Sequence, residues 1–424
     1  MLQDSAPMRI EIICTGDEVL TGKTINTNFS YISQKLEDAG LAVQWETTVG
    51  DDRDNLLRAF QLAGERADGV IVNGGLGPTV DDLSQEVAAR AAGVELVLNE
   101  EWLARMEERF RRRGRVMTAN NRKQAMLPAS AELIDNAIGT ACGFAVDIGR
   151  ARFMFTPGVP RELKRMIDDE IVPRLLAKSG VKATIFLKRF HSFGLSESHI
   201  DTLLAGLVDG APESSVKLGF RSHYPQIETK LTVRAGDLDT VKRMLAPLET
   251  EVRKQLGNFI VAEDEQTIEG VVLGALASRH ATLTTVETFT SGQIAARLGP
   301  LPAAETIFRR GVVARDLGEL GAAVGLDGAI TAITRQTAEA VARAARQTAG
   351  ATHALAVLID LDTGPDDINF GGRICIAIAT ESGIASRDDR LVGGRDRVRV
   401  GAAEMGLDCL RRALQGLPLE EQGR

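Results

Sequence analysis

Short runs of branched apolar residues alternate along the chain with longer segments whose apolar positions repeat at helical spacing. Among the first 180 residues, the apolar runs predict strands at 9–13, 41–49, 70–72 and 153–155. The periodic segments predict helices at 27–40, 51–66, 83–93, 100–113 and 162–176. Apolar strands of this kind are typical of a parallel sheet covered on both faces. The pattern therefore predicts an open α/β domain at the amino end.

Two further changes of pattern divide the rest of the chain. Residues 180–258 predict strand, helix, strand, strand and helix in a short stretch, which is typical of a small α+β module. From residue 264 a second large α/β unit is predicted, with strands at 282–286, 354–359 and 373–380 and helices at 267–280, 331–350 and 401–414. We expect an α/β protein with three domains, residues 1–178, 179–260 and 261–424.

A glycine-rich loop follows the apolar run at 70–72. Gly74, Gly75 and Gly77 allow a sharp turn and a close approach of backbone to a ligand. Thr79 and Asp82 have the spacing of a capping box at the start of the next helix. Loop amides and a helix N-terminus together favour phosphate binding. The same pattern also fits a structural turn with a solvated acidic first turn.

Carboxylates lie near the ends of the predicted strands. Asp81 and Asp82 are adjacent, and such a pair could hold the Mg²⁺ that accompanies polyphosphates. Strands ending near residues 13, 72 and 155 each lead into a loop that contains Gly or Pro. In an open α/β sheet, such loops line the ligand crevice. We therefore expect Asp17, Glu18, Asp81, Asp82 and the turn at 157–160 on one rim.

Composition narrows the functional classes. The chain has 50 Lys and Arg against 58 Asp and Glu, a formal net charge of −8, which disfavours a protein-wide nucleic-acid surface but permits a local basic patch. The arginine-rich run at 109–113 is predicted to be a solvated helix face. Four scattered cysteines argue against a zinc site or a disulfide framework. With no apolar stretch of membrane-spanning length and no leader pattern, we expect a soluble cytoplasmic protein.

Five motifs are distinctive: Cys-Thr-Gly-Asp-Glu-Val-Leu-Thr-Gly at 14–22 continuing to Asn28, Asn-Gly-Gly-Leu-Gly-Pro-Thr-Val-Asp-Asp at 73–82, Asn-Arg-Lys-Gln-Ala at 121–125, Gly-Thr-Ala-Cys-Gly-Phe at 139–144 and Pro-Gly-Val-Pro-Arg-Glu at 157–162. With them the chain resembles the CinA (competence/damage-inducible protein A) family over essentially its whole length. The resemblance implies a three-layer molybdopterin-binding-like first domain and a K-homology-like module containing Gly-Leu-Ser-Glu-Ser at 194–198. It also implies a last domain similar to nicotinamide-nucleotide amidohydrolase.

For the first domain, the resemblance implies metal-dependent hydrolysis of ADP-ribose to AMP and ribose 5-phosphate by a homodimer. The ion would be Mg²⁺, Mn²⁺, Co²⁺ or Ni²⁺, and potassium is a further candidate. The implied metal ligands are Asp17, Glu18, Asp81 and Asp82, with Asp81, Asp82 and Lys123 in catalysis, although Lys123 also fits an ordinary surface lysine. The implied substrate contacts are Thr15, Gly16, Asn28, Gly74, Gly75, Gly77, Thr79, Gln124, Gly158 and Pro160.

The last domain departs from the family pattern at its nucleophile. The family's Ala-Glu-Ser-Cys-Thr-Gly-Gly aligns with residues 286–292, so Thr288 replaces the serine. The family's Tyr-Ser-Asn-Glu-Ala-Lys aligns with residues 315–320, so Leu320 replaces the activating lysine, and its Gly-Ile-Ala-Gly-Pro aligns with residues 361–365. A hydroxyl without a base is a poor nucleophile. We expect a catalytically degenerate domain in which Arg395 and Arg399 still suit a nucleotide phosphate.

Three other functions are compatible with the sequence. The chain could be a non-enzymatic scaffold in competence or DNA recombination, a pterin-nucleotide binder, or a deamidase that uses Thr288. Acidic charge and 4% aromatic residues give little support to direct single-strand binding, which requires a basic groove with stacking rings.

Overall fold

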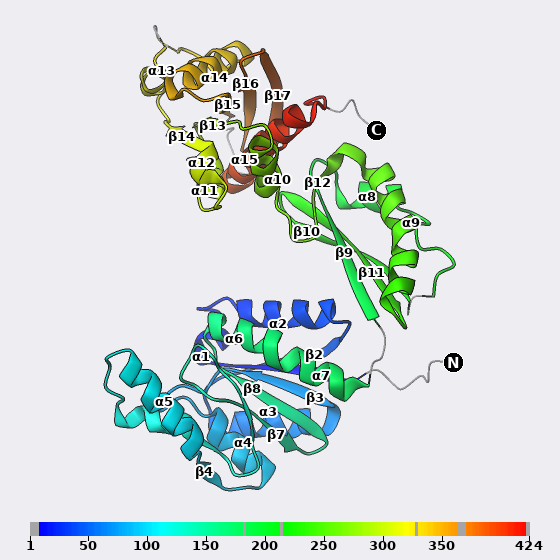
Figure 1. The fold of residues 1–424 in the computed structure, drawn as a ribbon, viewed down its shortest axis with the longest axis vertical. Coiled ribbons are helices and arrows are strands. Elements are labelled where there is room, and N and C mark those ends of the chain that lie inside the picture. Colours follow the sequence, from blue (N-terminus) through cyan, green and yellow to red (C-terminus); the bar gives the residue numbers. More distant parts are fainter. Residues whose placement is uncertain (1–7, 181–183, 213–214, 327–329, 363–369, 421–424) are drawn as a thin grey trace. The chain divides into compact units, whose positions relative to one another are not determined.

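The computed structural model describes residues 8–180, 184–212, 215–326, 330–362 and 370–420 (Figure 1). These residues form two compact units, of which the first ends at Ile185 and the second begins at Phe186. Helices and both parallel and antiparallel strands occur in each unit, so the predicted α/β class is confirmed. The domain boundaries stay predictions, and the boundary at 260/261 falls within the strand β12 (Ile260–Glu263).

A six-stranded sheet with the order β2-β1-β3-β8-β7-β6 forms the centre of the first unit. Its strands are β1 (Ile10–Thr15), β2 (Val43–Val49), β3 (Gly69–Asn73), β6 (Glu132–Ile134), β7 (Gly143–Ile148) and β8 (Ala151–Thr156). β1, β2, β3 and β8 run parallel to one another, whereas β7 runs antiparallel to both of its neighbours, β8 and β6. A separate pair, β4 (Leu96–Leu98) and β5 (Met126–Pro128), lies outside this sheet.

Helices cover both faces of this sheet, which explains why its central strands β1 and β3 are buried at every position. Ile12 packs with Ile32 and Leu163 on one face, whereas Ile13 packs with Phe60 and Val87 on the other. The helices are α1 (Asp17–Leu20), α2 (Thr27–Asp38), α3 (Arg53–Arg66), α4 (Ser84–Ala92), α5 (Glu100–Arg112), α6 (Pro160–Met166) and α7 (Val172–Ser179), with a 3-10 segment η1 (Ala119–Ala125) and a π segment η2 (Ile167–Ile171). The result is a three-layer domain.

The second unit begins with a four-stranded sheet of order β10-β11-β9-β12. Its elements are β9 (Thr184–Ser192), α8 (Glu197–Leu203), β10 (Val216–His223), β11 (Gln226–Ala235), α9 (Leu238–Leu256), a 3-10 turn η3 (Gly257–Phe259) and β12. This matches the predicted small α+β module, with β12 added as an edge strand. The hydrophobic cluster of the module lies between the sheet and its two helices.

A five-stranded sheet of order β14-β13-β15-β16-β17 completes the second unit. Its strands are β13 (Leu283–Glu287), β14 (Phe308–Val313), β15 (His353–Asp362), β16 (Gly371–Ala379) and β17 (Ile384–Val392). Its helices are α10 (Ile268–Ala277), α11 (Gln293–Leu298), α12 (Ala304–Ile307), α13 (Leu317–Val324), α14 (Arg335–Ala349) and α15 (Arg395–Gln415). No helix in the described ranges is both long and apolar enough to span a bilayer.

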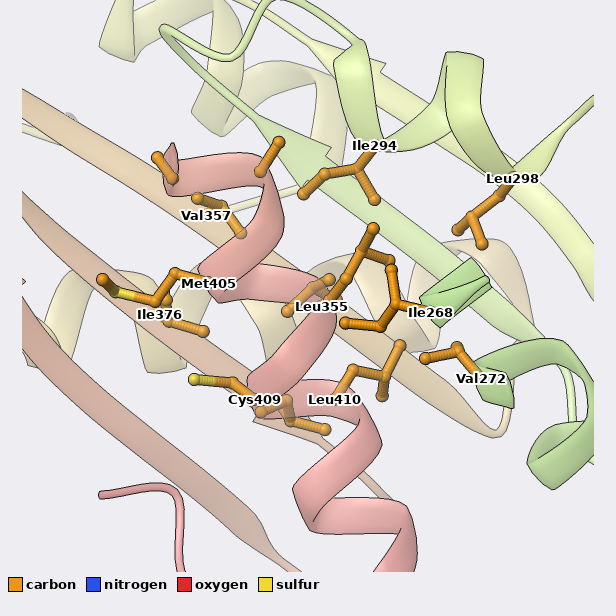
Figure 2. Packing of buried hydrophobic residues seen from close by; sticks show 14 of the residues in the cluster. Ile268, Val272, Ile294, Leu298, Leu355, Val357, Ile376, Met405, Cys409 and Leu410 are labelled. Atoms are coloured by element: carbon orange, nitrogen blue, oxygen red, sulfur yellow. The ribbon is translucent and has the colours of Figure 1, made fainter. Parts of the chain in front are cut away.

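The helix α15 is buried over most of its length and begins six residues earlier than the sequence pattern predicts. Figure 2 shows its side chains Met405, Cys409 and Leu410 near Leu355 of β15 and Ile268 of α10. Its buried carboxylates are paired. The Asp408 carboxylate lies 2.6 Å from Arg411 and 2.7 Å from Arg412. These contacts satisfy charges that would otherwise be costly to bury.

The end of α10 provides a test of backbone strain. His280 has φ 52°, and the amides of His280 and Ala281 donate to Ala277 and Leu276, so His280 occupies the left-handed position that closes the helix. Replacing His280 with glycine should raise the free energy of unfolding by about 0.5–1 kcal/mol, since glycine relieves the strain but is freer when unfolded. The measurement is thermal unfolding, with an expected rise in Tm of about 1–3 °C. His280→Ala, which keeps the Cβ atom, should give no gain; an equal gain for alanine would contradict the strain argument.

Candidate functional site

A cavity of about 430 Å³ lies where β1, β3 and β8 deliver their loops in the first unit. The sequence-predicted residues that line it are Thr15, Gly16, Glu18, Gly74, Gly75, Gly77, Asp81, Asp82, Gln124 and Gly158. The structure thus brings most of the predicted rim together, as the order of the parallel strands requires. Asp17, Asn28, Thr79, Lys123 and Pro160 are not among the lining residues. Pro157 and Val159 of the predicted rim turn also line it, as do residues that were not predicted as site residues: Asp51, Leu76, Pro78, Thr140, Ala141 and Glu162.

In the glycine loop, Gly74 and Gly75 lie too close to neighbouring atoms to carry a Cβ atom. Gly74 has φ 110°, and a Cβ atom there would lie 2.6 Å from Thr15 Oγ1 and 2.8 Å from Thr15 O. Gly75 has φ 69°, and a Cβ atom there would collide with Ser84. The Ser84 hydroxyl donates to Gly74 O at 2.8 Å, which fixes the loop against the start of α4. Glycine is therefore required at both positions.

A network of buried amides ties the loops of β3 and β8 together. The Asn73 Nδ2 atom donates to Thr156 Oγ1 at 3.2 Å and to Pro157 O at 2.8 Å. The Asn28 Nδ2 atom donates to Asn73 Oδ1 at 2.9 Å and to Gly158 O at 2.7 Å. Asn28, a predicted substrate contact, thus joins two loops in this structure instead of lining the cavity.

Two side chains of η1 donate hydrogen bonds to the glycine loop and to the turn that follows it. Lys123 Nζ donates to Thr79 O, and Gln124 Nε2 donates to Leu76 O at 3.4 Å. The Asp82 carboxylate accepts from the Thr79 amide at 2.8 Å and from its hydroxyl at 2.5 Å. However, α4 begins only at Ser84 and has no side-chain cap, so the predicted capping box is wrong. The Thr79–Asp82 pair forms a separate turn before the helix.

Acidic side chains gather on the β1 and β2 side of the cavity. The amide of Asp17 donates to Asp51 Oδ2 at 3.2 Å, and the amide of Asp51 donates to Asp17 Oδ1 at 3.1 Å. Burial raises the pKa of the Asp51 carboxyl, and the negative charges of Asp17, Glu18 and Asp81 raise it further, against a lowering by the Asp17 amide. Carboxylates that repel one another in this way favour a bound cation.

The contacts of these carboxylates decide which of their oxygen atoms can bind a divalent ion. Within the described part of the chain, no three His, Cys, Asp or Glu side chains are arranged to hold a metal. Asp17, Asp51 and Asp82 each have an oxygen engaged by neighbouring groups, and Glu18, Asp51, Asp81 and Asp82 line the cavity. Thr15 Oγ1 is buried there without a partner. Mg²⁺ usually takes one or two carboxylates together with substrate phosphates and water, so these groups fit an ion that binds with its phosphate ligand.

The arginine-rich end of α5 is only partly a solvated face. Arg111 and Arg112 are exposed and pair with Glu108, as predicted for such a face. Arg109 is half-buried instead, because its Nη2 atom donates to Asn136 O at 3.3 Å and to Ala137 O at 3.0 Å. For Arg109 the prediction is wrong: this side chain supports the loop that leads to Thr140 and Ala141 on the cavity wall.

The predicted nucleophile of the last domain is held by backbone groups. Thr288 is buried, and its Oγ1 atom accepts from the Ile359 amide at 2.9 Å. No basic side chain among the described residues forms a hydrogen bond with this hydroxyl. Leu320, which aligns with the family's lysine, is buried in a hydrophobic cluster with Val286. Residues 363–365 of the aligned Gly-Pro loop lie outside the described residues.

Two pairs of an arginine and an aromatic ring lie in the last domain, one of them at Phe289, which follows Thr288 in the sequence. The rings of Phe289 and Phe370 lie 6.0 Å apart and are both buried. Arg315 lies over Phe289 and Arg395 lies over Phe370, each with its guanidinium carbon 4.8 Å from the ring centroid. These are favourable cation–π contacts, so Arg395 already has a partner within the protein.

The loop between β13 and α11 nevertheless keeps a defined shape. The buried Glu287 carboxylate accepts from the amides of Ile294 and Ala295 at 3.0 Å. Ser291, which aligns with a family glycine, has φ 58°. Arg399 Nη1 donates to Gln293 Oε1 at 3.0 Å, so the start of α15 contacts the start of α11.

The chain is similar to known proteins along nearly its whole length. Three family models match in order: the probable molybdopterin binding domain at residues 11–177, the damage-inducible protein CinA KH domain at 188–262 and the CinA C-terminal domain at 265–414. A CinA-like protein of Shewanella sediminis is 38% identical over 416 residues, which cover 96% of each chain. A protein of Shewanella oneidensis named nicotinamide-nucleotide amidohydrolase PncC is 36% identical over 414 residues, again 96% of each chain.

Among solved structures, the protein CinA of Thermoplasma acidophilum is 33% identical, with a TM-score of 0.36, and the match covers 42% of this chain and 100% of that one. The match to curated relatives extends over nearly the full length of both chains. The chain belongs to the CinA family.

Proposed function

We propose that the first unit hydrolyses ADP-ribose to AMP and ribose 5-phosphate with the help of a divalent metal ion. The observation that carries this proposal is the single cavity in which glycine-loop positions and the carboxylates of Glu18, Asp51 and Asp81 meet. Exposed amides in a glycine loop suit a pyrophosphate, and carboxylate oxygens suit Mg²⁺ or Mn²⁺. The family resemblance suggests the substrate, and the groups that line the cavity suit the negative charge of its pyrophosphate together with a metal ion.

Each group in the cavity has a role in this proposal. The loop at Gly74, Gly75 and Gly77 binds the pyrophosphate and orients it. Glu18 and Asp51 would help to hold a divalent ion, which would supply polarisation of the phosphoryl oxygen and a lowered pKa of water when bound. Asp81, which lines the cavity, would accept the proton of the attacking water; a hydrogen bond from Thr79 lowers the pKa of its carboxyl, so the carboxylate is ionised and able to accept. Water oxygen then bonds to one phosphorus, and the bridging P–O bond breaks to give the two monophosphates.

For the last domain we propose that deamidase chemistry is lost. Thr288 lacks a hydrogen-bonded base in the described residues, and Leu320 supplies only apolar contact. The name of the Shewanella oneidensis relative makes nicotinamide-nucleotide amidohydrolase activity the second candidate. Homodimer formation, potassium binding and a scaffold role in recombination stay predictions from the family resemblance.

The principal prediction concerns the carboxylate at the glycine loop. Purified protein should release AMP from ADP-ribose with Mg²⁺, Mn²⁺, Co²⁺ or Ni²⁺ and stop when the ion is chelated. Asp81→Asn should lower kcat by about 10²-fold or more, since it removes the proposed base. The exposed Asp169→Asn, which removes the same charge far from the cavity, is the matched control. A scaffold would instead keep its partner binding in an Asp81→Asn, Asp82→Asn protein, and wild-type protein without ADP-ribose turnover would refute the enzymatic proposal.

A second prediction concerns the balance of stability and function at Asp51. Because the folded-state pKa of this carboxyl is raised, its ionised form destabilises the fold at neutral pH, and this effect disappears as pH falls through the folded pKa. Asp51→Asn keeps an acceptor for the Asp17 amide while it removes a repulsion of about 0.5 kcal/mol. Thermal unfolding at pH 7 should give a Tm about 1–2 °C higher, and the metal concentration needed for half-maximal hydrolysis should rise. A lower Tm at pH 7 would contradict this reading.

A third prediction concerns ammonia release from nicotinamide mononucleotide. General-base help is worth about 10²–10⁴-fold, so its loss should leave wild-type protein with at most trace turnover. Thr288→Ala should leave that trace unchanged in a coupled ammonia assay. Robust turnover that Thr288→Ala abolishes would show that the second candidate is correct.

A further inference from the structure

The cavity of the first unit has a second wall with different chemistry. Glu162, in the first turn of α6, lines it together with Thr140, Ala141 and Gly158. This wall lies on the β8 side of the glycine loop, whereas Glu18 and Asp51 follow β1 and β2. The proposed hydrolysis does not use Glu162.

Glu162 is held in place by a completely buried amide. Asn136 Oδ1 accepts from the amides of Ile138 at 3.3 Å and Gly139 at 2.9 Å. Its Nδ2 atom donates to Ala141 O at 2.9 Å and to Glu162 Oε2 at 2.7 Å. A Cβ atom on Gly139 would collide with the Glu162 carboxylate, so glycine makes room for it. The carboxylate is therefore positioned by the wall itself.

The second oxygen of this carboxylate is available to a ligand. Glu162 forms no ion pair with the described residues, and its only side-chain hydrogen bond there is the one from Asn136 to Oε2. Oε1 thus has no donor from the described protein. An ionised carboxylate is purely an acceptor, so a ligand that meets it must bring hydroxyl or amino donors. A phosphate would be repelled at this position.

The order of the strands places this acceptor relative to the proposed phosphate site. Neighbouring strands are about 4.8 Å apart, and the order β2-β1-β3-β8 puts β3, which leads into the glycine loop, between β1 and β8, so β1 and β8 are about 10 Å apart. A phosphate at the loop after β3 therefore has the acidic side on one flank and Glu162 on the other. The group attached directly to that phosphate, a sugar, would reach the Glu162 wall.

We propose that Glu162 accepts hydrogen bonds from the vicinal hydroxyls of a ribose 5-phosphate unit and selects ribose over 2-deoxyribose. The proposal rests on the proposed function only in placing the phosphate at the glycine loop. Two adjacent hydroxyls present two donors to one carboxylate, and a hydrogen bond to a charged group gives strong discrimination when its donor is missing. ADP-ribose contains two such units, one on the adenosine side and one at its free end.

The test measures binding by calorimetry with Mg²⁺ and the full-length protein, so it does not depend on turnover. AMP is compared with 2′-deoxy-AMP, and ribose 5-phosphate with 2-deoxyribose 5-phosphate. In at least one pair, wild-type protein should bind the ribose form about 10- to 100-fold more tightly. Glu162→Gln should bring this ratio close to one, and the pair that responds identifies which half of ADP-ribose meets Glu162.

The controls separate recognition from a structural role. Asp169→Asn removes an exposed carboxylate from the following helical segment and should keep the wild-type ratio. Equal weakening of both members of a pair in Glu162→Gln would show that Glu162 only anchors the wall, and would overturn the proposal. Absence of ribose preference in wild-type protein, or no binding of any of the four probes, would also overturn it. Ribose preference that depends on Glu162, without ADP-ribose hydrolysis, would retain this inference and refute the proposed function.

Discussion

The first unit depends on one buried side chain, the amide of Asn73 at the end of β3. It donates to the loop after β8 and accepts from Asn28 at the start of α2, so elements far apart in sequence are fixed at one edge of the sheet. A buried amide left without these partners would be costly, which makes the arrangement of the loops specific. The close packing of Gly74 against Thr15 adds a steric constraint in the same place. The cavity is thus formed by several loops that meet at one edge of the sheet, and no single motif forms it.

The two predicted sites differ in how their charged groups are paired within the protein. In the first unit, polar atoms face a cavity, and some of them, such as Thr15 Oγ1, lack protein partners. Around Thr288, the charged side chains of the described residues are engaged, because Glu287 bonds to helix amides and Arg315 and Arg395 lie on aromatic rings, although Thr290 Oγ1 is buried without a partner there. Charged groups that face a cavity are typical of a place for a ligand, whereas charged groups with protein partners are typical of a structural role.

Much of this architecture is predictable from the sequence because β1, β3 and β8 are mostly apolar and end in Gly or Pro loops. The strands β14 and β17 were missed, since they are rich in charge, as in the run from Arg387 to Arg390 of β17. Their ion pairs, such as Arg373 with Asp388, come from neighbouring strands and leave no local signal. Asp51 could have been found by applying the strand-end rule to β2, and Glu162 stands in a motif already noted. The contacts of Asn28 and Lys123 depend on tertiary structure, so no pattern in the sequence reveals them.

The helix α15 joins the last domain to the small α+β module through polar contacts. Its buried Glu404 receives a hydrogen bond of 2.5 Å from Gln226 in β11 and an ion pair of 2.8 Å from Arg297 in α11. Asn258, just before β12, accepts from Arg411 at the other end of the helix. The small α+β module and the last domain therefore share polar partners along one helix. Removing the last domain would leave Gln226 and Asn258 of the module without these partners, so the module and the last domain depend on each other for stability.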